Sequence, residues 1–293
     1  METRRMREDD LPACVEIFTE AWNDLHLRHG YEDEVSDDDS WLLQPLGYFL
    51  RTDPSGSLIA ETEGHPVAFG SSVTRDRFWC LSFLFVRPEA QGQGVGRRLL
   101  EELIPRNNDM VCTAEVEGFQ SVATALYAQT GMSPCAVRYF LTGPGRTDQE
   151  AVQQHRFTRV ALSTDDLPDV NHLDAQLLGF TRAEDHRWWL SAMSGHAFRH
   201  DGALVGYAYV DDGWIAPALA VDEATVGAMI ANLVADTRIP SEMRTSIFGT
   251  SGALFRELLG AGWRIEESNY SFIFLSNAGP LPPSYITHAA WLP

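Results

Sequence analysis

Residues 81–104, LSFLFVRPEAQGQGVGRRLLEELI, decide the fold of this chain. An apolar run of β-forming residues ends at Pro88, three glycines at alternate positions follow, and a helix-forming segment begins at about Val95. Glycine lets the backbone approach a ligand without a Cβ in the way, and the first amides of a helix have no acceptor within the helix. The order strand, glycine turn, helix therefore predicts a site for a phosphate or diphosphate.

The spacing of the glycines separates this site from two other nucleotide sites. A dinucleotide fingerprint has its third glycine three residues after the second, whereas Gly92, Gly94 and Gly96 alternate with other residues. The loop of nucleotide triphosphatases needs Gly-Lys followed by Ser or Thr, and the sequence does not contain that tripeptide. What remains is the pattern Gln91-x-x-Gly94-x-Gly96 directly after a strand.

This pattern resembles the acetyl-CoA signature of the GNAT superfamily of amine N-acetyltransferases, which reads Gln or Arg, two residues, Gly, one residue, Gly or Ala. The resemblance implies an α/β (α+β) fold in which a mixed central sheet is flanked by helices and two splayed strands hold acetyl-CoA. It also implies the residues that bind this co-substrate. They are Leu84, Phe85 and Val86 for the pantetheine arm, Gln91, Gly92, Gln93, Gly94, Val95, Gly96 and Arg97 around the diphosphate, and Gln120, where the family often has asparagine.

A second motif, Ala123-x-x-Leu126-Tyr127-x-x-x-Gly131, lies on a predicted helix further along the chain. It is similar to the family motif Asn-x-x-Ala-x-x-Leu-Tyr-x-x-x-Gly, whose tyrosine stands beside the CoA sulfur. A phenol with a pKa near 10 can donate a proton to a departing thiolate. We therefore expect Tyr127 to be the general acid.

The attacking amine must also lose a proton to a base. Many family members carry a glutamate on the strand before the glycine loop, at a position where this chain has Cys80. The candidates that remain are Glu115, Glu117 and Asp76, or a water chain through Ser82. Of these, Glu115 is the candidate base.

In the family fold, the segment between the first two helices shapes the acceptor pocket, here about residues 22–48. This region contains four aromatic or imidazole rings that we expect at the acceptor site, Trp22, His26, Tyr31 and Trp41, and the acidic runs 32–34 and 37–39. Aromatic faces and carboxylates suit a small cationic amine. His26 and His29 stand three residues apart, but further ligands are absent nearby, so no metal is expected.

Composition limits the partners and the compartment. The net charge of −19 disfavours nucleic acid and anionic membranes as partners. The sequence has no apolar run of about 18 residues or more, and its first residues, METRRMREDDLP, lack the apolar centre of a signal peptide. The four cysteines are widely spaced, which indicates reduced thiols. We expect a cytoplasmic protein.

The sequence also repeats itself weakly. The start REDDLP at residues 7–12 is echoed by TDDLP at 164–168, the strand and turn at 63–69 by 201–207, and a helix ending at Gly131 by one ending at Gly262. Three matches in the same order indicate a duplication. We expect a GNAT acetyltransferase domain over residues 1–143, a linker over 144–155, a degenerate GNAT-like domain over 156–277, and a proline-rich tail over 278–293 that lies extended on the surface.

The second half lacks both functional motifs. Its strand ending at Val221 corresponds to the one ending at Val86, and its helix is expected from Gly227, so the phosphate loop is reduced to residues 222–226 with two carboxylates. Leu258 takes the place of Tyr127. We therefore expect the second half not to bind CoA and to serve as a structural or acceptor-shaping partner.

The sequence thus predicts an N-acetyltransferase that moves acetyl from acetyl-CoA to a primary amine by direct attack in a ternary complex. The alternative from another class is a non-catalytic acyl-CoA-binding or sensing protein, which the missing strand glutamate favours. Within the enzyme class, a protein similar to aminoglycoside acetyltransferases is a further possibility. We expect either a monomer, with its halves paired as a pseudo-dimer, or a homodimer.

Overall fold

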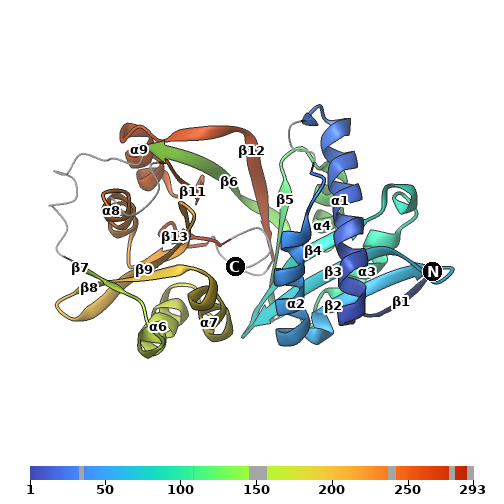
Figure 1. Cartoon of the computed structure of the whole chain (residues 1–293), viewed down its shortest axis with the longest axis horizontal. Helices are drawn as coiled ribbons and strands as arrows, with labels where there is room; N and C mark the ends of the chain where they lie inside the picture. The colour runs from blue at the N-terminus through green and yellow to red at the C-terminus, as the bar shows by residue number, and fades with distance from the viewer. Residues whose placement is uncertain (33–35, 108, 145–156, 237–241, 277–280, 289–293) are drawn as a thin grey trace. The chain divides into compact units, whose positions relative to one another are not determined.

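The structure is a computed structural model of the whole chain, and it describes residues 1–32, 36–107, 109–144, 157–236, 242–276 and 281–288. The chain forms two compact units (Figure 1). Of the described residues, unit 1 comprises 1–133 and 274–276, and unit 2 comprises 134–273 and 281–288. Apart from Pro144, the expected linker lies outside the described residues, as do both ends of the expected tail.

Unit 1 has a mixed sheet and four α-helices in its described part. In chain order its elements are β1 (Glu2–Arg5), α1 (Leu11–Arg28), α2 (Leu43–Thr52), β2 (Ser57–Thr62), β3 (His65–Arg75), β4 (Phe78–Val86), α3 (Val95–Leu103), β5 (Val111–Glu117) and α4 (Ser121–Gln129). The strand order is β1-β2-β3-β4-β5, antiparallel except for the parallel pair β4 and β5. The predicted strand, glycine turn and helix are confirmed, and α3 begins at Val95.

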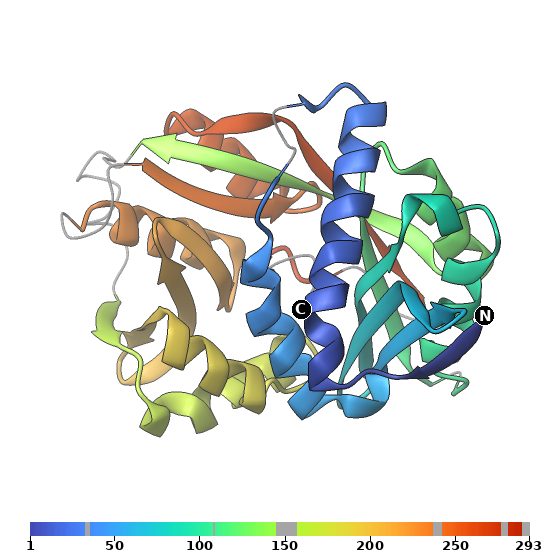
Figure 2. The same ribbon diagram turned by 45° about the vertical axis from the view of Figure 1, so that its right-hand side comes forward.

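The helices of unit 1 cover both faces of its sheet. Figure 2 shows α1 and α2 (blue) lying across the strands, and the Phe18 ring of α1 contacts Phe85 with 4.7 Å between centroids. On α3, Val95 and Leu99 pack in one cluster with Leu84. Leu84 and Phe85 are consecutive residues of β4, and successive side chains of a strand point to opposite faces of the sheet. Helix α3, which contacts Leu84, and helix α1, which contacts Phe85, therefore lie on opposite sides of β4.

The end of β12 (Arg264–Leu275) supplies the neighbour of β5 in unit 1. The backbone amide of Ser276 donates to the carbonyl of Cys112 at 2.9 Å, and the Thr113 hydroxyl donates to the carbonyl of Phe274 at 2.9 Å. Residues from the far end of the chain therefore complete the sheet of the first unit. The strand that follows α4, β6 (Ser133–Pro144), pairs instead with β11 of unit 2.

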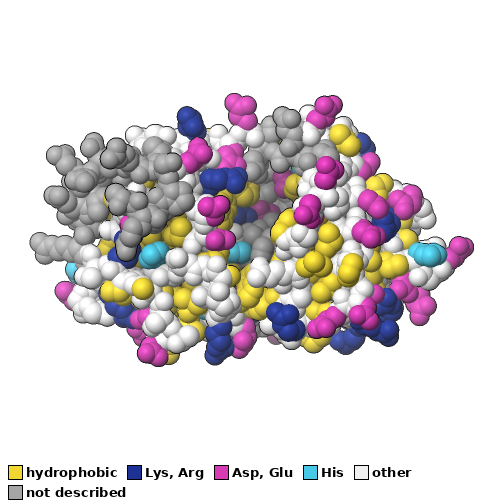
Figure 3. Space-filling view, in the orientation of Figure 1, with side chains coloured by type: hydrophobic (Ala, Val, Ile, Leu, Met, Phe, Trp, Pro, Cys, Tyr) yellow, Lys and Arg dark blue, Asp and Glu magenta, His cyan; other side chains and the backbone are white. Residues whose placement is uncertain are grey.

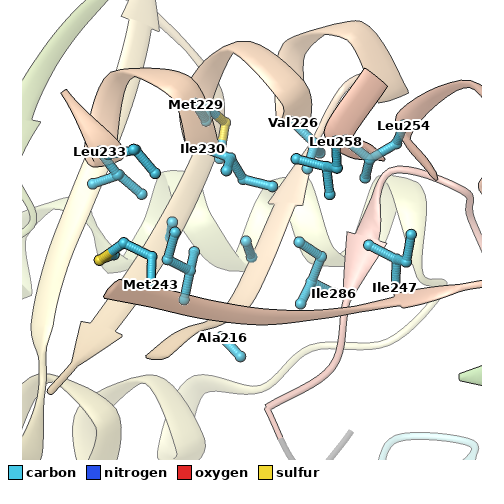
Figure 4. Packing of buried hydrophobic residues seen from close by; sticks show 14 of the residues in the cluster. Ala216, Val226, Met229, Ile230, Leu233, Met243, Ile247, Leu254, Leu258 and Ile286 are labelled. Carbon is cyan, nitrogen blue, oxygen red and sulfur yellow. The ribbon is translucent and has the colours of Figure 1, made fainter. Parts of the chain in front are cut away.

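Unit 2 repeats the element order of unit 1, which confirms the predicted duplication. Its elements are β7 (Thr158–Ala161), α6 (Leu167–Leu177), α7 (Ala183–Ala192), β8 (Ser194–His200), β9 (Ala203–Asp211), β10 (Trp214–Ala220), α8 (Glu223–Val234), β11 (Glu242–Phe248), α9 (Gly252–Gly260), β12 (Arg264–Leu275) and β13 (Tyr285–Ile286). The strand order is β7-β8-β9-β10-β11-β6-β12, and β13 pairs with β10. Figure 4 shows α8 and α9 residues, among them Met229 and Leu258, packed over Met243 and Ile247 of β11.

Two expectations about unit 2 are wrong. Helix α8 begins at Glu223 and not at Gly227, because the Asp222 carboxylate caps the helix by accepting from the amide of Thr225 at 2.8 Å. The tail does not lie on the surface at residues 284–287, since Tyr285 and Ile286 are each only 1% exposed. The aromatic and aliphatic side chains of these two residues bury apolar area that a surface tail would leave in water.

Candidate active site

The loop between β4 and α3 has the geometry of an anion site. Gly92 and Gly94 have φ angles of +74° and +80°, which favour glycine, and a Cβ on either would meet no atom within 4 Å. Gly94 is the N-cap of α3, and its carbonyl accepts the first helical bond, from Arg98, at 3.1 Å. The amides of the three residues between them have no acceptor within the helix. Open space and unused amides thus meet at the positive end of the helix dipole.

Side chains of the loop stabilise its conformation through hydrogen bonds to the backbone. The Gln91 amide donates to the carbonyl of Val86 at 3.0 Å, and the Gln93 amide donates to the carbonyl of Glu89 at 2.9 Å. The exposed Arg97 guanidinium donates to the side-chain oxygen of Gln129 on α4. Arg97 therefore links α3 to α4 across the end of the loop.

Strands β4 and β5 separate beside this loop. Their parallel pairing ends at Leu81 and Ala114, although β4 continues to Val86 and β5 to Glu117. The register with β3 shifts by one residue at Ser82, which marks a β-bulge. The expected pantetheine-holding residues 84–86 all lie beyond this point. The buried Ser82 hydroxyl has no hydrogen-bond partner among the described residues.

Tyr127 lies on α4 and is 6% exposed. Its ring makes an edge contact with Phe274, at 5.8 Å between centroids. Burial, reinforced by the nearby Cys80 thiol, raises the pKa of Tyr127 above its usual value of 10. The phenol is therefore protonated at neutral pH, which is the state that a proton donor needs. Gln120 caps the same helix, accepting from the amide of Val122 at 3.3 Å.

The candidate bases are spread along the sheet. Glu115 directly follows the last paired residue of β5, and Glu117 ends that strand, so both lie on its separated part. Asp76 lies in the turn between β3 and β4, with a φ angle of +52°, at the opposite end of β4 from the separation. Cys80 is buried within β4. Glu115 and Glu117 therefore lie where β4 and β5 are separated, whereas Asp76 lies at the other end of β4.

The rings expected at the acceptor site form one cluster in unit 1. Trp22 stacks on His26, with 4.1 Å between centroids, and His26 lies 6.1 Å from Tyr31. Trp41, 49% exposed, makes an edge contact with Phe18 at 5.8 Å. Figure 3 shows hydrophobic side chains (yellow) gathered over α1 and α2. Residues 33 and 34 of the first acidic run lie outside the described residues.

Two further rings belong to this cluster, and the sequence analysis missed them. Phe18 connects it to β4 through Phe85, and Phe119, after β5, lies 4.8 Å from Tyr31 and 5.5 Å from His26. The spacing of Phe18, four residues before Trp22, placed it on the same helix face and could have identified it. The cluster therefore extends from β4 to the segment that follows β5, on the face of the sheet that α1 covers.

The two histidines of this region are fixed by the backbone. The Nδ1 atom of His26 lies 2.9 Å from the carbonyl of Trp22, and that of His29 lies 2.8 Å from the carbonyl of Leu25. Within the described ranges, no three His, Cys, Asp or Glu side chains gather as metal ligands.

Unit 2 has different groups at the corresponding places. Asp222 fills the N-terminus of α8, and Glu223 accepts from the amides of Ala253 and Leu254 at the N-terminus of α9. Leu258, in the place of Tyr127, is buried in the apolar core. Carboxylates at the helix start would repel a diphosphate.

Comparison with known proteins assigns the family. The profile of the acetyltransferase (GNAT) family matches residues 11–132. An uncharacterized N-acetyltransferase of Archaeoglobus fulgidus is 30% identical over 115 residues, which cover 36% of this chain and 71% of the relative. The chain belongs to the GNAT acetyltransferase family. It is therefore an acyltransferase of a family that uses acetyl-CoA.

Solved structures extend the GNAT fold to the whole chain. A protein of Pyrococcus horikoshii covers 100% of this chain and 95% of its own, at a TM-score of 0.76 and 13% identity. A tandem GNAT protein from the clavulanic acid biosynthesis pathway covers 95% of this chain and 99% of its own, at a TM-score of 0.55 and 16% identity. Both units thus have the GNAT fold. Among the described helices, none is long and apolar enough to span a membrane.

The residues of unit 1 fit acetyl-CoA, the co-substrate that the GNAT family uses. The unused amides at the start of α3, with open space at Gly92 and Gly94, suit the diphosphate. The separated edges of β4 and β5 offer main-chain groups to an extended pantetheine arm.

Proposed function

We propose that unit 1 transfers acetyl from acetyl-CoA to a primary amine of a small cationic acceptor, by direct attack in a ternary complex. One observation carries the proposal: β4 and β5 separate at Leu81 and Ala114, between the glycine loop on one side and the aromatic cluster on the other. Co-substrate and acceptor can therefore meet at the same opening from opposite faces of the sheet.

The residues of unit 1 have separate tasks in this proposal. The amides at the start of α3 bind the diphosphate and fix the position of the thioester, which acetyl-CoA supplies as an activated acetyl group. Tyr127 holds a proton on its phenolic oxygen and gives it to the departing thiolate. Glu115, on the separated part of β5, accepts the proton of the amine, directly or through water.

The cluster around Trp22 and His26 selects the acceptor. Aromatic faces attract a cation by their quadrupole, with about 0.5–2 kcal/mol for each well-placed ring. Asp39, which is 6% exposed, lies beside the cluster and accepts from the Trp41 indole at 3.3 Å and from the Thr19 hydroxyl at 2.8 Å. A buried carboxylate close to aromatic rings favours an acceptor with a second positive charge.

Two measurements test this function. Titration calorimetry with acetyl-CoA should show one binding site per chain, and no heat at high micromolar concentration would contradict the first step. A panel of mono- and polyamines should then be assayed for thiol release. Release with diamines but not with neutral alcohols supports transfer to a cationic amine. Binding of acetyl-CoA without release for any acceptor would instead favour the non-catalytic acyl-CoA sensor.

A further inference from the structure

Strands β10 and β11 of unit 2 separate in the same way as β4 and β5 of unit 1. Their parallel pairing is limited to Trp214 with Arg244 and Ile215 with Thr245. Beyond this point the register of β10 shifts between Ile215 and Ala218, as at the bulge of β4. The two strands then leave an opening between residues 218–220 and the end of β11.

The chain's own C-terminal segment fills this opening. Strand β13 pairs antiparallel with β10, Ile286 opposite Ala218 and Tyr285 opposite Leu219, and the amide of Ala220 donates to the carbonyl of Ser284 at 3.3 Å. Strand β13 also contacts β11. Figure 4 shows Ile286 beside Ile247 of β11 and below residues of α9. Residues 284–287 are between 1% and 6% exposed, so the segment is part of the core.

The segment takes the place that pantetheine would take in unit 1. Strand β10 ends at Ala220 and not at the expected Val221, so residues 218–220 of β10 correspond to residues 84–86 of β4 in the repeat. Both groups follow a bulge and precede the helix of the phosphate loop. An extended peptide and a pantetheine arm both carry amide groups that can bond to the edge of a strand. In unit 2, a peptide uses that edge.

Side-chain contacts make the opening selective for this peptide. The Tyr285 hydroxyl accepts from the fully buried Arg182 at 3.0 Å, and its ring lies 6.2 Å from Phe248. Ile286 enters the apolar cluster under α8 and α9. At the other end, the Asp222 carboxylate occupies the helix N-terminus that a diphosphate would need. The opening thus has a pocket for a hydroxylated ring, one for an aliphatic chain, and none for an anion.

We propose that the opening between β10 and β11 is a peptide-binding groove, which takes an extended Tyr-Ile segment by strand addition and is occupied in cis by residues 284–287. The groove is a converted cofactor groove that acyl-CoA does not enter. The tandem chain therefore has one co-substrate site and one site for its own C-terminal peptide.

Cysteine labelling in the intact chain tests whether the segment stays in the groove. Ile286→Cys should react with a thiol reagent on the order of 10²-fold more slowly than Pro283→Cys, an exposed neighbour in the same segment, because reaction requires the segment to leave the groove. Saturating acetyl-CoA should not change this ratio. Equal rates for the two variants, or faster labelling of Ile286→Cys with acetyl-CoA, would overturn the proposal. The comparison without acetyl-CoA does not depend on the function of unit 1.

A nicked protein tests the groove as a binding site. A protease site inserted between residues 279 and 280 allows the folded chain to be cut, after which the C-terminal peptide should remain bound during gel filtration. A labelled peptide LPPSYITH should exchange into the groove, and its Tyr285→Phe form should bind roughly 10-fold more weakly, because one hydrogen bond to a charged group is lost. Loss of the cut peptide from a chain with unchanged circular dichroism, or a second acetyl-CoA site after cutting, would contradict a peptide groove.

Discussion

Nη1 of Arg182 donates a hydrogen bond of 3.0 Å to the phenolic oxygen of Tyr285, and both side chains are buried. Arg182 also forms an ion pair with Asp174 at 2.9 Å, and Asp174 in turn accepts from the hydroxyl of Tyr207 at 2.5 Å. His186 lies 2.9 Å from the same carboxylate. This network joins the start of α7, helix α6, strand β9 and the C-terminal segment in one set of bonds.

Removing the cation of this network should destabilise unit 2. In Arg182→Met the carboxylate of Asp174 stays buried without its counter-charge, and we expect a loss of about 3–5 kcal/mol in the free energy of unfolding. Denaturant unfolding followed by tryptophan fluorescence measures this loss. The control is Arg187→Met on α7, the helix that Arg182 precedes. The ion pair of Arg187 with Glu184 is exposed, and its loss should change stability by about 0.5 kcal/mol or less. Similar losses in both variants would contradict the assignment.

His186 should make the stability of unit 2 depend on pH. Burial, together with the charge of Arg182, lowers the pKa of His186 below its usual value of 6.5. The folded chain therefore keeps the ring neutral, while the unfolded chain takes up a proton below about pH 6.5. Stability should fall as the pH drops below that value, by at most about 1.4 kcal/mol per pH unit from this one group.

Thermal unfolding between pH 7.5 and 5 checks this dependence. His186→Gln should flatten the slope of Tm against pH, whereas His172→Gln, an exposed histidine on α6, should leave it as in the parent. Parallel slopes for the parent and His186→Gln would show that another group titrates.

Gly94→Ala should weaken the binding of acetyl-CoA. The new Cβ would project into the open space where we place the diphosphate, and the left-handed backbone adds strain of about 1–2 kcal/mol. Gly64→Ala in the turn between β2 and β3 is the matched control, because Gly64 has the same φ of +80° and equally open surroundings. Both variants should lose similar stability, but only Gly94→Ala should lose affinity in calorimetry. Unchanged affinity would place the diphosphate elsewhere.

Tyr127→Phe should lower turnover and spare binding. Loss of a general acid typically costs roughly 10²–10⁴-fold in rate, whereas the ring of Tyr127 and its contact with Phe274 remain. Steady-state thiol release gives kcat, and calorimetry gives the Kd of acetyl-CoA. Tyr139→Phe, on β6 in unit 2, should leave both values unchanged. Normal turnover in Tyr127→Phe would exclude it as the acid.

Local motifs made the glycine loop and the duplication predictable from sequence. The alternating glycines before Val95 require a particular backbone, and a helix start leaves free amides in any protein context. The strand separation followed from the family resemblance, and the register of Leu81 with Ala114 confirms it. The role of Tyr127 as the general acid and the role of the rings in acceptor binding stay predictions. The structure does bring Trp22, His26 and Tyr31 together.

The features that sequence reasoning missed depend on contacts between distant residues. Tyr285 and Ile286 follow a proline-rich stretch that is typical of a surface tail, and only the opening beside β10 makes them part of a core. Asp174 and Arg182 look like ordinary polar residues near helix ends. Nothing in their spacing indicates that both are fully buried, because the tyrosines that bond to them, Tyr207 and Tyr285, come from strands further along the chain.

The strand contributed by residues 274–276 affects how the protein matures during translation. Because these residues border β5, the sheet that carries the glycine loop keeps an open edge until residues 274–276 have left the ribosome. We expect a nascent chain stalled at Gly262 to bind no acetyl-CoA and to recruit chaperones, which pull-down of stalled ribosomes would reveal. Products that terminate before residue 274 would then remain inactive, so residues 274–276 would be required for transferase competence.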